Sequence, residues 1–321
     1  MGKNSQLDYD DTITLLICSN RSDIQLDGIW KNVLNESLLR EIIFVAQGQA
    51  KKYKRKINKV KYIYLSSKGR GRAINAGLRK VATENIVLTD DDCLLHHYFI
   101  HQANLALSNK SIDLVFGKTL PYKPGNNLRK FCPCTFSKKE KNFVRTGICK
   151  HWIDIGFDNN VAIKKKVFQN IGGYKWWLGP GSIGVGAEDA EFILRSLIAG
   201  YKIGYNDSMI VYHNKWLDKR ERIDQNRVYF SSGLAAYGFY AFQGVRECWP
   251  MCVEHLGWAY NLILDELRLG IYKPRMIFFV IVNIILHVMA VFRGLFIAFI
   301  FAKLIPIPVK EDVVKRYYKN K

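Results

Sequence analysis

Acidic residues are scarce in this chain. Its 321 residues include 28 Asp and Glu against 48 Lys and Arg, which gives a formal net charge of +20 and a pI of about 9.6. Such an excess favours an anionic partner, whether nucleic acid, a phosphorylated substrate or anionic lipid. The chain has no arginine-rich arm and no stacked-aromatic RNA motif, which argues against nucleic acid.

A Cys-x-x-Cys pair is also absent, although the chain has seven cysteines. The polar first residues show no cleavable signal peptide, so we expect an intracellular protein with reduced thiols. Two closer pairs, Cys132 with Cys134 and Cys149 with His151, have a spacing that would hold zinc. Free loop thiols are the alternative.

Short apolar runs alternate with helical stretches in the first part of the chain. Runs at 12–18, 41–46, 61–65 and 85–89 are expected to be strands buried on both faces. This alternation predicts an α/β fold with a mostly parallel, Rossmann-like sheet flanked by helices. Ligands of such sheets bind at the carboxyl ends of the strands.

Three consecutive aspartates, Asp90, Asp91 and Asp92, follow the fourth run. Residues two apart on an extended chain point to the same side, so Asp90 and Asp92 face one point in space. Clustered carboxylates favour Mg²⁺ or Mn²⁺, and such a metal keeps positions open for phosphate oxygens. A solvated acidic turn that caps the next helix is the alternative.

A second acidic pair, Glu188 and Asp189, opens a predicted helix shortly after a glycine-rich stretch at 178–185. Acidic residues in a first turn complement the helix dipole, so charge stabilisation without catalysis is one interpretation. The glycines favour another, because they let a substrate approach the backbone closely.

Seven motifs occur in an order that resembles the inverting family-2 glycosyltransferases of the GT-A fold, over roughly residues 12–215. The motifs are Cys18-Ser19-Asn20-Arg21, Gly71-Arg72-Ala73-Ile74-Asn75-Ala76-Gly77, Thr89-Asp90-Asp91-Asp92, Asn159-Asn160-Val161-Ala162-Ile163, Gly172-Gly173-Tyr174, Gly186-Ala187-Glu188-Asp189 and Val211-Tyr212-His213. The resemblance implies transfer of a sugar from a nucleotide-diphosphate sugar to a hydroxyl of a glycan, a polysaccharide or a lipid-linked acceptor. By family habit the donor is a UDP-sugar.

The resemblance also implies which residues bind the nucleotide: Ser19, Asn20, Arg21, Gln47, Arg72, Asn75, Asp90 and Asp91. One of them departs from the family pattern. The family usually has an acidic residue after the second strand to read the base, and Gln47 stands there instead. This substitution leaves the identity of the base open.

The metal and the base follow from the same resemblance. Asp92 resembles the carboxylate that binds Mn²⁺ or Mg²⁺, with Asp90 and His213 as further candidates. Asp189 resembles the catalytic base, with Glu188 as a neighbour that could share the role.

Two adjacent tryptophans are candidates to contact the acceptor. Trp176 and Trp177 precede the glycine-rich stretch and would stack on a sugar or lipid-linked acceptor. Packing in the core is the alternative.

The last third of the chain differs in composition from the rest. Residues 216–270 read as a helical, aromatic cover on the acceptor side of a catalytic domain at 12–215, between a disordered N-terminus at 1–11 and a hydrophobic segment at 271–303. As one helix, the apolar run 276–302 would reach about 40 Å, longer than a membrane's hydrocarbon core. Basic residues flank it on both sides, including a basic tail at 304–321.

We therefore expect a re-entrant or in-plane helical hairpin broken near Arg293-Gly294, at the cytoplasmic face of the membrane. A buried hairpin or a homo-oligomer interface is the alternative. A catalytically silent GT-A scaffold is the alternative function. Gln47 favours that scaffold, whereas intact Asp90, Asp92 and Asp189 argue against it.

Overall fold

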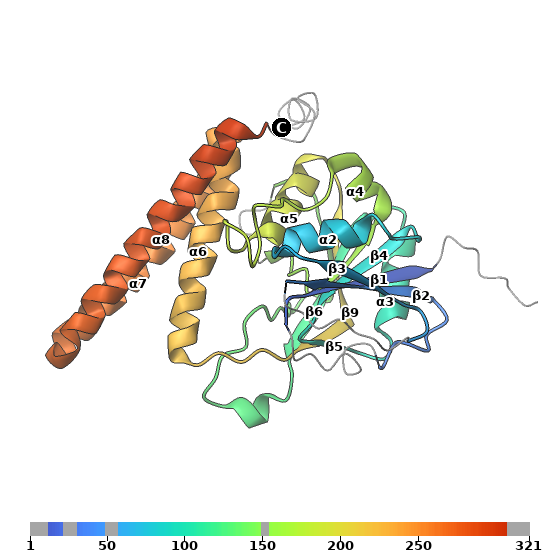
Figure 1. Cartoon of the computed structure of the whole chain (residues 1–321), viewed down its shortest axis with the longest axis horizontal. Helices are drawn as coiled ribbons and strands as arrows, with labels where there is room; N and C mark the ends of the chain where they lie inside the picture. The colour runs from blue at the N-terminus through green and yellow to red at the C-terminus, as the bar shows by residue number, and fades with distance from the viewer. Residues whose placement is uncertain (1–11, 22–30, 49–56, 149–153, 307–321) are drawn as a thin grey trace, which may run out of the picture.

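The computed structural model describes residues 12–21, 31–48, 57–148 and 154–306. Its centre is a nine-stranded sheet in the order β3-β2-β1-β4-β8-β6-β9-β5, with β7 also paired to β9 (Figure 1). Four strands are parallel neighbours: β1 (Ile13–Ser19), β2 (Leu39–Gln47), β3 (Val60–Leu65) and β4 (Asn85–Asp90). They coincide with the four predicted runs, which confirms the strand assignment.

The remaining strands make the sheet mixed rather than mostly parallel. β8 (Asn160–Lys164) is antiparallel to β4 and to β6 (Leu114–Pro121), and β9 (Ile203–His213) is parallel to β6. β5 (Cys93–Leu95) and β7 (Asn142–Arg145) are antiparallel to β9. The reversal brings the start of β8 beside the end of β4. Residues just before β8 therefore reach the same edge of the sheet as the aspartates after β4.

Helices cover both faces of the sheet and bury a hydrophobic core on each (Figure 1). α3 (Phe99–Ser108) packs on one face. α2 (Arg70–Leu78), α4 (Lys165–Ile171) and α5 (Glu188–Ile198) pack on the other. This arrangement leaves the strand ends open between α2 and α5.

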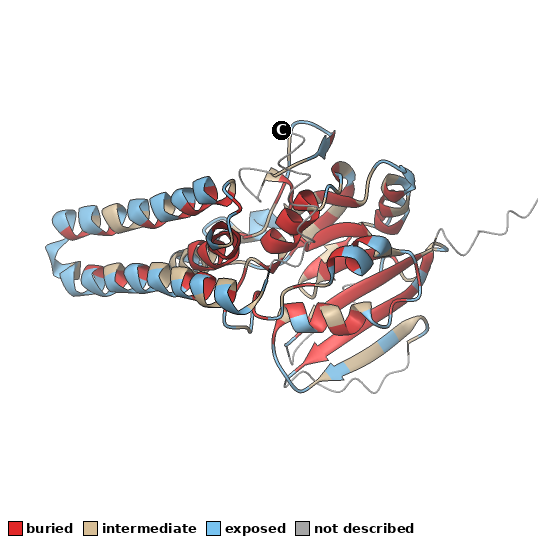
Figure 2. Ribbon diagram, turned by 90° about the horizontal axis from the view of Figure 1, so that it is seen from above, coloured by how far each residue is buried: buried red, intermediate tan, exposed pale blue. Residues whose placement is uncertain are grey.

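Three long helices follow the sheet: α6 (Lys219–Phe242), α7 (Cys248–Tyr272) and α8 (Ile277–Leu304). Asp218 caps α6 by accepting from the Glu221 N–H (2.9 Å), while Glu221 accepts from the Asp218 N–H (2.8 Å). The last part of α6 is buried against α5, α7 and α8. α7 and α8 form a hairpin that projects from the domain, at the left in Figures 1 and 2, and Figure 2 shows that its outer surface is exposed.

α8 is one unbroken helix, so the prediction of a break near Arg293-Gly294 is wrong. Gly294 serves close packing instead, because a Cβ there would lie 2.4 Å from the Ser231 carbonyl oxygen of α6. Arg293 turns back to the domain and donates to the Ile183 carbonyl (2.8 Å). A short polar pair inside an apolar run thus marks a helix contact, not a turn.

The segment Pro274–Leu304 is long and apolar enough to cross a membrane, with a mean hydropathy of 2.4. Large apolar side chains are exposed along it, for example Phe278, Ile285, Phe292 and Phe296. This exposure is unlike that of a helix in the core of a soluble protein.

Candidate active site

The ends of β1, β2 and β4 converge with the start of β8 and with the turn that opens α5. Two adjoining cavities lie there. The strand-end cavity, of about 490 Å³, is lined by residues at and just after the ends of β1, β2 and β4, together with Arg70, Pro180 and residues 214–216. The inner cleft, of about 140 Å³, extends from Asp90 and Asp92 to Glu188 and Asp189. The two acidic groups that the sequence singled out therefore share one site.

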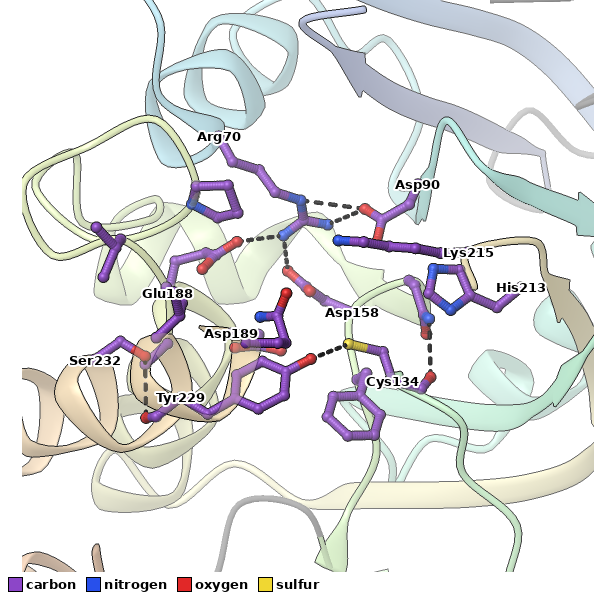
Figure 3. Close-up of a pocket in the computed structure, with 18 of the residues that line it drawn as sticks. Arg70, Asp90, Cys134, Asp158, Glu188, Asp189, His213, Lys215, Tyr229 and Ser232 are labelled. Atoms are coloured by element: carbon purple, nitrogen blue, oxygen red, sulfur yellow. Dashed lines mark hydrogen bonds and ion pairs between the residues drawn. The ribbon is translucent and has the colours of Figure 1, made fainter. Parts of the chain in front are cut away.

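Arg70, the first residue of α2, is the centre of the charged network in the inner cleft (Figure 3). Its guanidinium donates to Asp90 Oδ1 (2.8 Å), Asp158 Oδ2 (2.7 Å) and Glu188 Oε1 (2.9 Å). An arginine stays charged in proteins, so one cation serves three carboxylates. It holds β4, β8 and α5 together at the strand ends.

Asp91 joins the end of β4 to the turn after β1. Its carboxylate accepts from the Ser19 hydroxyl, and Ser19 Oγ accepts from the Arg21 N–H (3.1 Å). Burial raises the pKa of Asp91 to about 6, although the Ser19 hydrogen bond lowers it. Asp91 thus shapes the wall of the strand-end cavity.

Asp92 and His213 form a pair at the floor of the inner cleft, with 3.2 Å between Asp92 Oδ1 and His213 Nε2. His213 Nδ1 lies 2.7 Å from the Pro133 carbonyl, which fixes the ring. Burial opposes the protonation of His213, but the hydrogen bond and charge of Asp92 outweigh it and raise the pKa to about 10.

Potential metal ligands meet at this pair. One ligand atom each from Asp92, Cys93 and His213 lies within 4.8 Å of the others. Burial raises the pKa of the Cys93 thiol well above its usual value. A hard divalent cation prefers the Asp92 carboxylate and the His213 imidazole, which would lose its proton on binding the metal. This donor set fits a divalent cation such as Mn²⁺. Asp90, the third predicted ligand, lines the same cleft but is held by Arg70.

Glu188 and Asp189 begin α5 after a strained turn. Val185 (φ 58°) and Ala187 (φ 60°) both adopt left-handed backbone conformations, which cost about 1–3 kcal/mol each in residues other than glycine. The turn is closed by the Gly179 N–H, which donates to the Gly186 carbonyl (3.1 Å). The backbone conformation of this turn sets the direction in which the first residues of α5 face.

The two acidic residues differ in their partners. Glu188 is buried and bound by Arg70, and burial raises its pKa to about 7. Asp189 keeps some exposure to the cleft, and its carboxylate accepts from the Ala190 N–H (2.8 Å). Burial, followed by the charges of Asp158 and Glu188, raises the pKa of Asp189 well above its usual value. Asp189 is the carboxyl group better placed to accept a proton from a molecule in the cleft.

The strand-end cavity gathers most residues predicted to bind a nucleotide: Ser19, Asn20, Arg21, Gln47, Asp90 and Asp91. Two buried polar atoms in its wall, Gln47 Oε1 and Trp216 Nε1, have no hydrogen-bond partner among the described residues. An orphan acceptor and an orphan donor in one cavity suit a polar ligand.

Arg72 and Asn75 do not line either cavity, which corrects their predicted role. Arg72 is exposed, with its guanidinium 5.0 Å from the Trp176 ring centre. Asn75 accepts from the Tyr174 N–H (2.8 Å) and donates to the Tyr174 carbonyl (2.7 Å). Residues 70 and 72 point about 200° apart on a helix, so only one of the two arginines can face the strand ends.

The tryptophan pair also lies outside the inner cleft. Trp177 is fully buried and stacks on Phe301 of α8, with 4.3 Å between ring centres. Packing in the core, the alternative for this residue, is therefore its role. Trp176 is 46 % exposed and lies beside Arg72 and Phe301.

The proposed cysteine pair does not form a shared metal site. Cys132 Sγ lies 3.7 Å from His213 Nδ1, whereas Cys134 Sγ lies 3.2 Å from the Tyr229 hydroxyl. Cys149 and His151 lie outside the described residues.

Sequence reasoning missed Arg70, Asp158, Lys215 and Tyr229, which all line the inner cleft. Arg70 stands in the run Gly69-Arg70-Gly71-Arg72. To select Arg70 rather than Arg72, one must know which residues of α2 face the strand ends. The position of Asp158 at the cleft could have been predicted only if the antiparallel direction of β8 had been known. Tyr229 comes from α6, and nothing in the local sequence indicates its contact with the cleft.

Comparisons with known proteins agree with this fold. Residues 18–172 match the family model for glycosyl transferase family 2. The fold resembles the crystal structure of S. aureus TarS 1-349, with a TM-score of 0.52 and 12 % identity over 97 % of this chain and 92 % of that chain. TarS 1-349 in complex with UDP and with UDP-GlcNAc gives TM-scores of 0.53, at 12 % and 13 % identity and the same coverage. A search of curated protein sequences gives no match.

Proposed function

We propose that this chain is a glycosyltransferase that transfers a sugar from a UDP-sugar to an acceptor hydroxyl, with inversion at the anomeric carbon. The match of residues 18–172 to glycosyl transferase family 2 and the TarS-like fold support this proposal. One observation carries the proposal: Asp189 lines the same cleft as Asp90 and Asp92. In this proposal the leaving-group site and the base face one shared space. Residues 12–215 form the catalytic domain in this proposal, and 216–270 its cover.

The nucleotide occupies the strand-end cavity. Gln47 Oε1 is a free acceptor there, which fits the N–H of a uracil ring. Structures of TarS in complex with UDP and UDP-GlcNAc support the same class of donor. Ser19 and Asp91 hold the turn on which the ribose would rest.

Asp92 and His213 would hold a divalent cation, Mn²⁺ or Mg²⁺. When bound, the metal stabilises the negative charge of the departing diphosphate. Lys215 lines both cavities and would add positive charge beside the diphosphate.

Asp189 acts as the base. The acceptor oxygen loses its proton to Asp189 and forms a bond to the anomeric carbon, while the bond from that carbon to the diphosphate oxygen breaks and UDP leaves. A single displacement inverts the configuration and needs no covalent nucleophile. Glu188, bound by Arg70, is the positioning residue that orients the start of α5.

The acceptor is a glycan, a polysaccharide or a lipid-linked molecule, and the reaction takes place at the cytoplasmic face of a membrane. The exposed apolar surface of the α7–α8 hairpin supports this location.

The test is UDP release from a panel of UDP-sugars in the presence of Mn²⁺, with membrane lipids and cell polysaccharide supplied as acceptors. Asp189→Asn should reduce turnover by about 10²–10⁴-fold, the usual contribution of a general base, while UDP binding persists. Asp154→Asn, at a half-exposed surface position, is the control and should keep full turnover. If the wild-type protein binds UDP but forms no UDP from any UDP-sugar, the result would indicate the silent scaffold instead.

A further inference from the structure

A third cavity lies outside the catalytic site, where the first turns of α6 pack against the α7–α8 hairpin. This hairpin cavity has a volume of about 610 Å³, within the range of about 300–1,000 Å³ that is typical of small-molecule sites. Ile223, Leu262, Leu269, Met276 and Phe279 supply apolar wall. It could therefore enclose part of a hydrocarbon chain.

A buried polar network ends in this cavity. Asn283 donates to Glu266 Oε1 (3.1 Å), and Arg227 donates both to Asn283 Oδ1 and to His287 Nδ1 (2.9 Å from Nε). Because Nδ1 accepts, the proton of neutral His287 is on Nε2.

The two ends of the network have no partners. Glu266 and His287 line the cavity and are more than nine-tenths buried. Within the part of the chain that the structure describes, Glu266 Oε2 and His287 Nε2 make no hydrogen bond. Such orphan atoms are uncommon in folded proteins and indicate a missing polar group. A ligand with hydroxyl and acidic oxygens would satisfy both.

The rim of the cavity is basic. It is lined by four basic residues, Lys219, Arg220, Arg222 and Lys273, and by two acidic residues, Asp265 and Glu266. Asp265 is paired with Arg268 (3.3 Å), so its charge is partly balanced outside the cavity. The rim therefore favours an anion.

Apolar side chains surround the tip of the hairpin next to this rim. Tyr272 and Phe278 are 82 % and 78 % exposed. An anionic group bound at Lys273 would thus lie where the protein meets a lipid surface.

We propose that the hairpin cavity binds a phosphate-bearing lipid, with its headgroup at the basic rim and the first part of its chain against the apolar walls. The ligand is either a membrane phospholipid or a lipid-phosphate acceptor, which share this chemistry. The site is separate from the inner cleft but uses the same helix: Ile223 and Asn226 of α6 line the cavity, while Gln225 and Tyr229 line the cleft. Lipid binding does not depend on the proposed transfer reaction.

The test measures binding of dodecyl phosphate to the full chain in neutral detergent, with dodecanol, dodecyltrimethylammonium and inorganic phosphate as comparison ligands. We expect dodecyl phosphate to bind at least tenfold more tightly than each of the three. Lys219→Glu with Lys273→Glu should weaken it about tenfold. The control Lys303→Glu, an exposed cation at the other end of α8, should leave it unchanged.

A second variant, Leu269→Trp, fills the cavity without changing charge and should also weaken binding, while UDP affinity reports that the catalytic domain is intact. Equal affinity for dodecyl phosphate and dodecanol, or binding unchanged in both cavity variants, would overturn the proposal. Mass spectrometry of lipid extracted from the purified protein distinguishes the sources. Two acyl chains indicate a membrane phospholipid, and one long chain on a phosphate indicates an acceptor.

Discussion

The inner cleft and the α7–α8 hairpin depart from ordinary protein structure in opposite ways. The cleft buries charge: Arg70 holds Asp90, Asp158 and Glu188 within 2.9 Å. The hairpin exposes apolar surface along its whole length. Burying charge and exposing apolar side chains both disfavour the folded chain in water.

The two regions differ in what offsets these unfavourable free energies. In the cleft, Arg70 pairs with three carboxylates and His213 pairs with Asp92, so these buried charges have partners before any ligand binds. The hairpin has no such balance within the described residues, and its compensation must come from another surface. The inner cleft supports the proposed transfer reaction, and the hairpin supports the proposed membrane location.

The largest expected effect concerns the arginine. Arg70→Met leaves three carboxylates without their cation, and removing one partner of a buried ion pair costs about 3–5 kcal/mol of unfolding free energy. Arg72→Met, two residues on and exposed, is the matched control and should stay within about 0.5 kcal/mol. Denaturant titrations measure both. Equal losses would show that Arg70 does not organise the cleft.

The next effect concerns the hairpin surface. Phe278→Glu with Phe292→Glu removes exposed apolar area from α8, and each large side chain contributes about 1.5–3 kcal/mol when it enters an apolar medium. Sedimentation with anionic vesicles should fall by about tenfold or more, whereas Leu128→Glu on the sheet domain, 87 % exposed, should not change it. Unaltered sedimentation would favour a protein partner for this surface.

A smaller effect tests how the hairpin is joined to the domain. Gly294→Ala places a Cβ against the Ser231 carbonyl of α6, and overpacking of this kind costs about 1–3 kcal/mol. Gly257→Ala on α7, where a Cβ meets open space, should instead gain up to about 1 kcal/mol from helix propensity. Thermal unfolding of the two variants should therefore shift in opposite directions.

The smallest effect is on pH dependence. A base must be ionised, and burial raises the pKa of Glu188 to about 7 and that of its neighbour Asp189 well above its usual value. Transfer activity should therefore begin to fall at a pH well above the usual range in which an aspartate titrates, by roughly tenfold per pH unit below that point.

Glu188→Gln removes a like charge beside Asp189 and should move this inflection to lower pH. A wild-type inflection near the unperturbed aspartate value of about 4 would contradict the raised pKa of Asp189.

Much of this comparison was predictable from sequence. Apolar runs gave β1 to β4, and the family resemblance assigned Asp90, Asp92 and Asp189 to one site. The choice of Arg70 over Arg72 depends on the phase of a helix, and the role of Asp158 depends on the direction of β8. Neither is visible in a local pattern. Trp177 and Gly294 were misread because packing between distant helices decides their surroundings.

The central claim is that Asp92 and His213 bind the metal that holds a diphosphate opposite Asp189. Crystals soaked with Mn²⁺ and UDP test it directly through the anomalous signal of manganese. We expect one strong peak in contact with Asp92, with the diphosphate beside it and uracil next to Gln47. A manganese peak elsewhere, or UDP bound outside the strand-end cavity, would contradict the account.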